Sequence, residues 1–263
     1  MKNLKIPMTS EEFELMEWKL GWKHEYWDGF ARLAPRYNGV LVKLPVEKRE
    51  LEPAIKIRSV SESDYEQLVG AFYDAFVDTV EYCNRVKRDV KESARRNIRD
   101  FFDGERGIPN LALSKAAVAP RNKNRIVGAA LVSKYKYGYK NEILFVRPKY
   151  QNAGIGTTLV TGVLNDLRDK KEKIFWSEYH VCNEQSAAWH KKFGFVEELD
   201  ITVARMRYRY FQHEVWRHEK MDEKEKAKEY KPHLKKAEAE LKRLETVEKE
   251  DFDAAWLGWR HDF

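Results

Sequence analysis

One glycine-containing segment constrains the fold of this chain more than any other. Residues 146–157 read Val-Arg-Pro-Lys-Tyr-Gln-Asn-Ala-Gly-Ile-Gly-Thr, directly after an apolar run and directly before apolar residues with helical spacing. Gly154 and Gly156 lack a Cβ, so backbone N–H groups converge there without obstruction, and the following helix adds its unpaired amides and positive dipole end. The segment therefore predicts a strand, a loop that binds an anion such as a pyrophosphate, and a helix.

The flanking segments predict strands that alternate with helices. Alternating or continuous apolar runs predict strands, and apolar residues spaced by three and four predict helices. The expected strands cover residues 54–60, 111–120, 125–135, 141–148, 173–181 and 201–211. The expected helices cover residues 65–76, 86–102 and 154–167, with a short helix before Gly194.

Two common nucleotide-binding motifs are excluded by the residues around the glycines. No Gly-Lys-Ser/Thr follows them, as a P-loop needs. Leu159 stands where a dinucleotide fingerprint has its third glycine. An ordinary tight strand-to-helix turn is the alternative for an isolated G-x-G.

Two motifs together resemble the GNAT superfamily of N-acetyltransferases. Residues 146–156, with the pattern V-x-P-x-Y-Q-x-x-G-x-G, are similar to the acetyl-CoA pyrophosphate loop of that family. Residues 183–195, N-x-x-S-x-x-W-H-x-x-F-G-F, resemble its second signature, N-x-x-A-x-x-L-Y-x-K-x-G-F. The resemblance covers residues 54–211 and implies an α/β (α+β) GNAT fold, a mixed and mostly antiparallel central sheet flanked by helices.

The resemblance implies that acetyl-CoA is the cosubstrate and that no metal is needed. Family members bind its pyrophosphate with the amides of the glycine loop and its pantetheine arm with the preceding strand. Asn183 resembles an Asn that hydrogen-bonds this arm, although Asn is also a favoured N-cap. The implied cofactor-binding residues are Leu144, Phe145, Val146, Gln151, Asn152, Ala153, Gly154, Ile155, Gly156, Thr157 and Asn183.

The chemistry that the resemblance implies is direct acetyl transfer to a bound amine. Neither cysteine is then needed as a nucleophile, and Cys182 is expected to be a small buried residue. His190 stands where the family has a Tyr that protonates the leaving thiolate, and imidazole donates protons near neutral pH. The alternative is that His190 is a surface residue of a short helix. Trp189 replaces a family Leu and is expected in the core.

A general base must accept a proton from the acceptor amine. Glu142 matches the place where some members have a base carboxylate, and its alternative is a solvent-facing residue near a strand start. Glu178 and His180 are the other candidates, and alternation puts them on one face of the strand over 173–181. In the family a bulge in the strand before the loop splays it from this second strand and opens the cleft.

The ends of the chain lie outside the resemblance. We expect residues 1–53 to be an aromatic extension with a short helix over 11–20, capped by Ser10, and a small meander of strands. Residues 212–263 are expected to be a charged helical extension with Pro232 in the first turn of its last helix. Both extensions should pack on the central domain 54–211 or across a homodimer, burying Trp22, Trp27, Trp256 and Trp259.

Charge gives one indication about the acceptor. The chain has a formal net charge of +6, and residues 85–125 hold twelve Lys/Arg against five Asp/Glu. This excess would attract an acidic partner: the CoA 3′-phosphate, an anionic amine or, less favoured, RNA. The alternative is a solvated helix face. No run of 18 apolar residues occurs, so we expect a cytoplasmic protein with no membrane partner.

The leading function is an acetyl-CoA-dependent N-acetyltransferase for an unidentified amine. His190 in place of Tyr and the long extensions leave two alternatives. One is a GNAT-fold ligand-sensing or interaction module without turnover, and the other is a toxin-like acetyltransferase acting on aminoacyl-tRNA.

Overall fold

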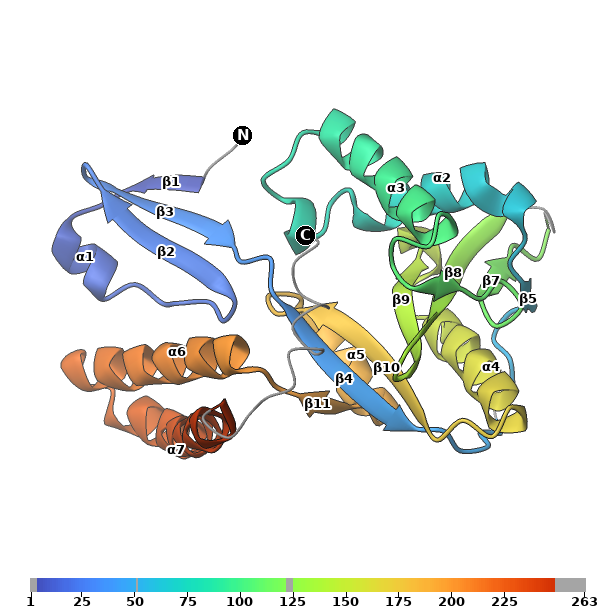
Figure 1. The fold of residues 1–263 in the computed structure, drawn as a ribbon. Coiled ribbons are helices and arrows are strands. Elements are labelled where there is room, and N and C mark those ends of the chain that lie inside the picture. Colours follow the sequence, from blue (N-terminus) through green and yellow to red (C-terminus); the bar gives the residue numbers. More distant parts are fainter. Residues whose placement is uncertain (1–3, 51, 122–124, 249–263) are drawn as a thin grey trace. The chain divides into compact units, whose positions relative to one another are not determined.

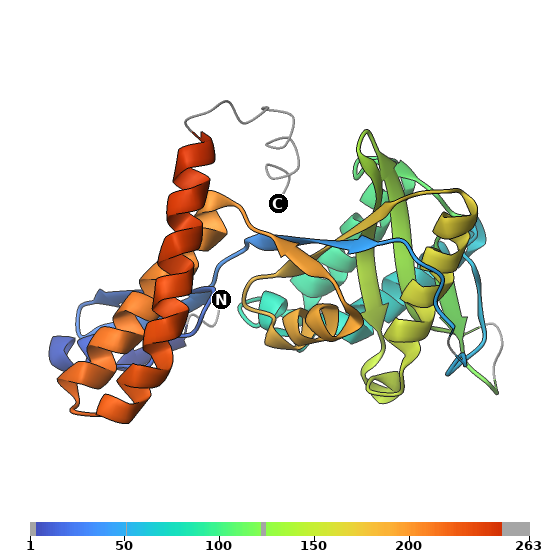
Figure 2. The same cartoon turned by 90° about the horizontal axis from the view of Figure 1, so that it is seen from below.

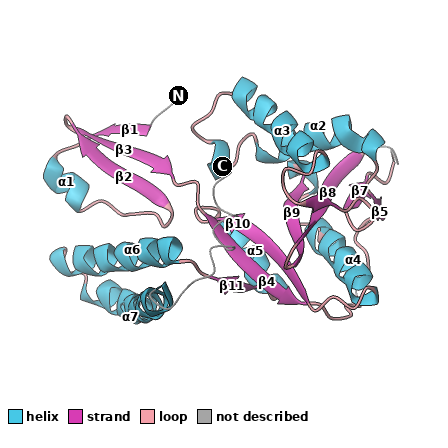
Figure 3. Cartoon of the chain, in the orientation of Figure 1, coloured by secondary structure: helices cyan, strands magenta, loops and turns pink. Residues whose placement is uncertain are grey.

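A computed structural model describes residues 4–50, 52–121 and 125–248 of the chain (Figures 1 and 3). The chain divides into two compact units. The larger contains residues 41–179 and 188–197. The smaller contains the described residues of 2–40, 180–187 and 198–263.

The larger unit is built on an eight-stranded sheet in the order β11-β4-β10-β9-β8-β7-β5, with β6 paired to β8. Strand β4, which the sequence places in the N-terminal meander, lies in this sheet between β11 and β10. Strands β5 to β9 pair antiparallel where their register is given, and β9 and β10 are parallel. The strands are β4 (Gly39–Pro45), β5 (Ile57–Ser59), β6 (Ile108–Pro109), β7 (Lys115–Val118), β8 (Ile126–Tyr135), β9 (Gly138–Val146), β10 (Ile174–His180) and β11 (Val196–Glu198).

Helices cover both faces of this sheet. Helices α2 (Tyr65–Phe76) and α3 (Lys87–Phe102) lie on one side of β7 to β9, and α4 (Ile155–Asp169) lies on the other (Figure 1). Helix α5 (Glu184–Phe193) follows β10. The predicted spacing in α3 is confirmed, since its fully buried residues are Val90, Ala94, Ile98 and Phe101. Of these, Ala94, Ile98 and Phe101 pack with α2 residues and with β8 and β9 in one core cluster.

The two central strands separate part-way along their length. Parallel pairing of β9 with β10 ends at Asn141 and Ser177, although both strands continue. On the other edge of β9, Ile143 pairs with Leu131 and Asn141 with Val132 of β8, so Glu142 is an extra residue in a β-bulge. The expected bulge and splay are confirmed, and we call the Asn141–Ser177 pair the splay vertex.

The smaller unit combines a three-stranded antiparallel sheet, β1-β3-β2, with helices. Helices α6 and α7 pack against each other and lie side by side in Figure 2. Its elements are β1 (Leu4–Pro7), α1 (Ser10–Glu14), β2 (Trp22–Trp27), β3 (Phe30–Pro35), α6 (Ile201–Lys220) and α7 (Lys224–Glu248).

Two predictions for the C-terminal part are wrong. The alternation over 201–211 predicts a strand, but these residues begin α6, because the Asp200 carboxylate accepts the Val203 N–H at 2.8 Å and caps the helix. Helix α7 starts before Pro232 and runs through it, so Pro232 does not sit in the first turn. Packing on α6 compensates for the hydrogen bond that a proline removes. The expected domain boundary at residue 211 falls inside α6.

The N-terminal part also differs from expectation in detail. Helix α1 is shorter than residues 11–20, and Thr9 rather than Ser10 caps it, in a capping box with Glu12. Trp22 is half-buried, whereas Trp27 is 61% exposed. Trp256 and Trp259 lie outside the described residues.

A fully buried carboxylate organises the smaller unit. Glu214 of α6 accepts hydrogen bonds from the backbone N–H of Trp18 (2.9 Å) and from Arg217 (2.8 Å). The Trp18 indole stacks on His213 and on His24, with ring centroids 3.9 and 5.2 Å apart. Burial acts to raise the pKa of Glu214, but hydrogen bonds from His213, Trp18 and Arg217 outweigh it and hold the pKa at about 2.

We predict that the smaller unit loses stability in mild acid through His24. Burial, and next the neighbouring His213, lower the pKa of His24 to about 4, and its Nε2 accepts the Lys19 N–H at 3.3 Å, which requires a neutral ring. The unfolded chain takes up this proton near pH 6.5 and the folded unit does not, so the unfolding free energy should fall from about pH 6.5 to about pH 4. Glu214, whose pKa is depressed, should lose its contribution only below about pH 4.5.

Amide hydrogen exchange in β2 and β3 at pH 7 and 4.5, corrected for intrinsic rates, measures this loss. His24→Phe keeps a ring on Trp18 but cannot titrate, so it should remove the pH 6.5-to-4 component. The same pH dependence in His24→Phe as in the natural chain would contradict the prediction.

Candidate active site

The loop between β9 and α4 presents unpaired backbone donors. Within the described residues, no hydrogen bond leaves the N–H groups of residues 152–157, and the first helical amide to reach a carbonyl is Thr158, bonded to Gly154 at 2.9 Å. Helix N-termini with free amides attract anions through these donors and the helix dipole. The loop therefore suits a pyrophosphate.

The loop conformation depends on Gly154. This residue is the N-cap of α4 with φ +73°, a left-handed conformation that strains residues with a Cβ. Gly156 has ordinary helical geometry, and a Cβ there would meet only Trp189, at 3.8 Å or more. Upstream, the Gln151 side chain donates to the Val146 carbonyl at 2.9 Å and fixes the start of the loop.

Among the described residues, the end of β9 next to the loop is paired on one edge only. Leu144, Phe145 and Val146 pair with β8, and they lie beyond the splay vertex, where β10 has left β9. The Phe145 side chain is part of the core cluster, so only its backbone is available to a ligand. Asn183 caps α5 by accepting the Ser186 N–H at 2.9 Å, as the N-cap interpretation predicts.

A buried ion cluster lies next to the bulge. The Lys140 Nζ is 2.9 Å from Glu178 Oε2 and 3.5 Å from Glu142 Oε2. The Glu142 side chain is 5% exposed, so the expectation of a solvent-facing residue is wrong. Its Oε1 is buried and has no hydrogen-bond partner in the described part of the chain. Sequence reasoning missed Lys140, whose alternation with Glu142 was the available signal.

Burial sets the protonation of this cluster. It raises the pKa of Glu142 above the usual carboxyl range, against the opposing effects of Lys140 and a hydrogen bond from Tyr135. Burial would lower the pKa of Lys140, but Glu178 and Glu142 together keep it raised. A carboxylate with a raised pKa beside an ammonium is suited to accept a proton near neutral pH.

His190 belongs to a second group of hydrogen-bonded buried side chains. This group also contains Ser177, which sequence reasoning missed. His190 is 3% exposed, so the interpretation as a surface residue is wrong. Its Nε2 is 3.0 Å from the Oγ of Ser177, and the Asn141 Nδ2 donates to the same Oγ at 3.4 Å. His190 is therefore joined to both residues of the splay vertex.

The two polar clusters lie on opposite faces of the sheet. Lys140 pairs with Ser133 of β8, on the face where Leu131 and Ile143 meet α2 and α3. Asn141 pairs with Val132 and with Ser177, on the other face. The sheet thus separates the cluster of Lys140, Glu142 and Glu178 from the polar chain that contains His190.

The sequence also singled out Trp189, Cys182 and His180. Trp189 is half-buried rather than in the core, and it stacks on Phe193 with ring centroids 5.1 Å apart. Cys182 is buried, as predicted, and its Sγ lies 2.8 Å from the Nδ1 of His180. His180 also meets the ring of Tyr37 edge-on.

The exposed face of α3 carries the predicted positive charge. Arg88, Lys91, Arg95 and Arg99 follow one another at helical spacing, and Arg96 is exposed beside them. Arg88 and Arg99 have acidic neighbours in Asp89 and Asp100. Lys91, Arg95 and Arg96 form no ion pair with any described residue.

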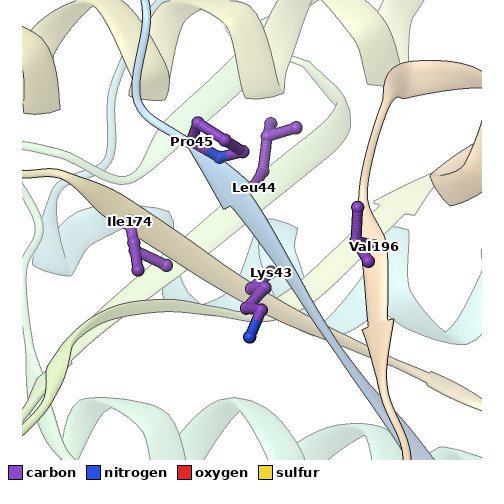
Figure 4. A pocket seen from close by; sticks show the side chains of 5 residues that line it. All are labelled: Lys43, Leu44, Pro45, Ile174 and Val196. Carbon is purple, nitrogen blue, oxygen red and sulfur yellow. The ribbon is translucent and has the colours of Figure 1, made fainter.

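A shallow pocket lies elsewhere, on the strands at one end of the sheet (Figure 4). It is lined by Lys43, Leu44, Pro45, Ile174 and Val196. None of the predicted site residues lines it. No helix in the described ranges combines the length and the apolar character needed to cross a membrane.

Residues 85–195 match the sequence profile described as the Acetyltransferase (GNAT) family. This part of the chain is a GNAT acetyltransferase domain. The match runs from the start of α3 to Phe195, so it contains the loop between β9 and α4, the splayed strands, the ion cluster and His190. Among curated proteins, none matches the chain.

Solved structures with a similar fold include several GNAT proteins. The paia N-acetyltransferase of Thermoplasma acidophilum, in complex with coenzyme A, is 20% identical with a TM-score of 0.43, over 55% of this chain and 91% of that one. A GCN5-related N-acetyltransferase from Sphaerobacter thermophilus is 14% identical with a TM-score of 0.45, over 61% and 48%. The ribosomal-protein-S18-alanine N-acetyltransferase of Escherichia coli is 17% identical with a TM-score of 0.41, over 55% and 79%.

Proposed function

We propose that the chain transfers an acetyl group from acetyl-CoA directly to an amine. The observation that carries this proposal is the loop of unpaired amides over residues 152–157, directly after the unpaired edge of β9, inside a GNAT domain. The loop amides would hold the pyrophosphate, and the backbone of residues 144–146 would hold the pantetheine arm. Acetyl-CoA supplies an activated acetyl thioester when bound.

The residues around the splay vertex would manage the protons. Glu142 is the better base, because its Oε1 has no hydrogen-bond partner in the described part of the chain, whereas Glu178 lies 2.9 Å from Lys140 Nζ. His190, on the other face, would supply the proton that the departing sulfur needs. Asn183 remains an expected contact of the cofactor arm. Base and acid on opposite faces of the sheet suit a reaction in which the amine attacks the thioester from one side and the thiol departs on the other.

Titration calorimetry with CoA, combined with free-thiol release from acetyl-CoA over a panel of amines, tests this function. Gly156→Ala should keep CoA affinity within a few-fold, because a Cβ there makes ordinary contacts. Gly156→Val should lower the affinity at least about tenfold, since its extra methyl groups enter the space in front of the loop amides. Unchanged affinity in a folded Gly156→Val protein would falsify the loop assignment. CoA binding without amine-dependent thiol release would instead favour the ligand-sensing module.

We predict that Glu142 sets the acidic limb of the pH–rate profile. The base acts when deprotonated, so kcat/KM should fall as pH drops through the raised pKa of Glu142, at a higher pH than an ordinary carboxyl gives. Glu142→Gln should reduce kcat by about 10²-fold or more. Lys140→Met removes the ammonium that favours the carboxylate and should shift the limb to still higher pH.

Glu178→Gln is the matched comparison. Glu178 also contacts Lys140, but unlike Glu142 it has no buried carboxylate oxygen without a hydrogen-bond partner in the described part of the chain. A large loss in Glu178→Gln with none in Glu142→Gln would transfer the role of base to Glu178.

The basic face of α3 favours an acceptor that carries negative charge. Replacing Arg95, Arg96 and Arg99 together with Gln should raise the KM of such an acceptor and leave CoA affinity unchanged. The matched control replaces three exposed lysines of α7, Lys228, Lys235 and Lys236, with Gln. Steep loss of affinity between about 50 and 200 mM salt would indicate a polyanion such as RNA, and a shallow loss a small anionic amine. If both triple variants have the KM of the natural chain, the face is only a solvated surface.

A further inference from the structure

We propose that Ser177 passes the proton of His190 to the departing sulfur and is therefore itself a catalytic residue. The inference rests on the proposed acetyl transfer and goes beyond it, because neither motif includes Ser177. It starts from the position of His190, whose ring is 3% exposed and has its Nε2 3.0 Å from the Ser177 Oγ. A proton that leaves His190 through this nitrogen reaches Ser177 first.

Ser177 is placed where such a proton would be used. It is the last residue of β10 that pairs with β9, so its side chain lies where the two strands begin to separate. It is 1% exposed, and its hydroxyl lies between the His190 ring and the Asn141 amide. A hydroxyl both donates and accepts a hydrogen bond, as a relay requires.

Asn141 provides an independent sign that the vertex receives a ligand. Asn141 is 3% exposed, and its Oδ1 is buried without a hydrogen-bond partner among the residues that the structure describes. Buried amide oxygens are almost always bonded, and leaving one unbonded costs about 1–3 kcal/mol. A ligand with a donor at the vertex, such as an amide N–H of the pantetheine arm, would satisfy it.

The proposed step balances in atoms and charge. The amine nitrogen forms the new N–C bond, the C–S bond breaks, and its electron pair moves to sulfur. Ser177 gives its Oγ proton to the sulfur and takes the Nε2 proton of a protonated His190, which becomes neutral. Glu142 accepts the surplus proton of the amine on the opposite face of the sheet.

Two aromatic rings restrict the orientation of the His190 imidazole. Tyr179 and Phe195 flank the imidazole with ring centroids 5.4 and 5.1 Å away, and these rings restrict its orientation. Restricted in this way, the ring keeps Nε2 directed at the hydroxyl. The rings thus position His190 without entering the proton path.

The relay predicts a specific pattern of kinetic losses. Ser177→Ala and His190→Gln should each lower kcat by about 10²-fold while CoA affinity changes less than about threefold. The double variant should lose no more than either single one, because both changes interrupt one path. His190→Gln is chosen because its amide can still donate to the Ser177 Oγ and so preserves the packing. Ser133→Ala, at a fully buried serine of β8 without a hydroxyl partner, is the control for removing a buried hydroxyl.

A second measurement needs no turnover. The thiol of bound CoA is titrated by its thiolate absorbance in the natural chain and in Ser177→Ala. A hydrogen bond from Ser177 favours the thiolate, so the thiol pKa should rise by about one unit in the variant.

The possible results separate the relay from the proposed function. Multiplying losses in the double variant, or an unchanged kcat and an unchanged thiol pKa in Ser177→Ala, overturn the relay while acetyl transfer stands. A Ser177-dependent thiol pKa in a chain that transfers no acetyl group supports the contact and overturns the transfer. Failure of the natural chain to bind CoA overturns both.

Discussion

The early end of pairing between β9 and β10 is the constraint on which the rest of the larger unit depends. Two parallel strands normally stay hydrogen-bonded along their shared length, because an unpaired buried strand edge is costly. Here the bulge at Glu142 changes the direction of β9, and pairing stops at Asn141 and Ser177. The freed edge of β9 leads directly to the loop of unpaired amides, so backbone groups without a partner among the described residues continue from the strand into the loop.

The same break determines which side chains meet. Alternation along β9 and β10 puts Glu142, Lys140 and Glu178 on the face of α2 and α3, while Asn141 and Ser177 face His190. The bulge acts on the residues after Glu142: without the extra residue, Ile143 would lie on the face of Asn141 instead of in the core with α2 and α3. The sheet therefore separates a charged cluster suited to accept a proton from a polar chain suited to deliver one. The buried Glu214 network shows that the smaller unit is held by a different interaction, a carboxylate satisfied by Trp18, His213 and Arg217.

Local sequence patterns predicted the elements that depend on residues close together in the chain. Apolar residues four and three apart define α3, and the glycines before α4 define the loop. The same kind of pattern failed at residues 201–211, where apparent alternation hid a helix whose start depends on the Asp200 cap. It also failed at Pro232, because packing on α6 maintains a helix that the local sequence would interrupt. In both places a tertiary or capping interaction outweighed a weak local preference.

The sequence by itself determined the glycine loop between a strand and a helix, the alternation of strands and helices through the GNAT domain and the presence of His190 at the position of the family Tyr. These features depend on residues that are neighbours in the chain. Only the tertiary structure decided that Glu142 is buried, that Lys140 joins it to Glu178, and that Ser177 lies between His190 and Asn141. These relations join β9, β10 and α5, and they depend on the register between strands that are distant in the chain, which leaves no mark on the local sequence.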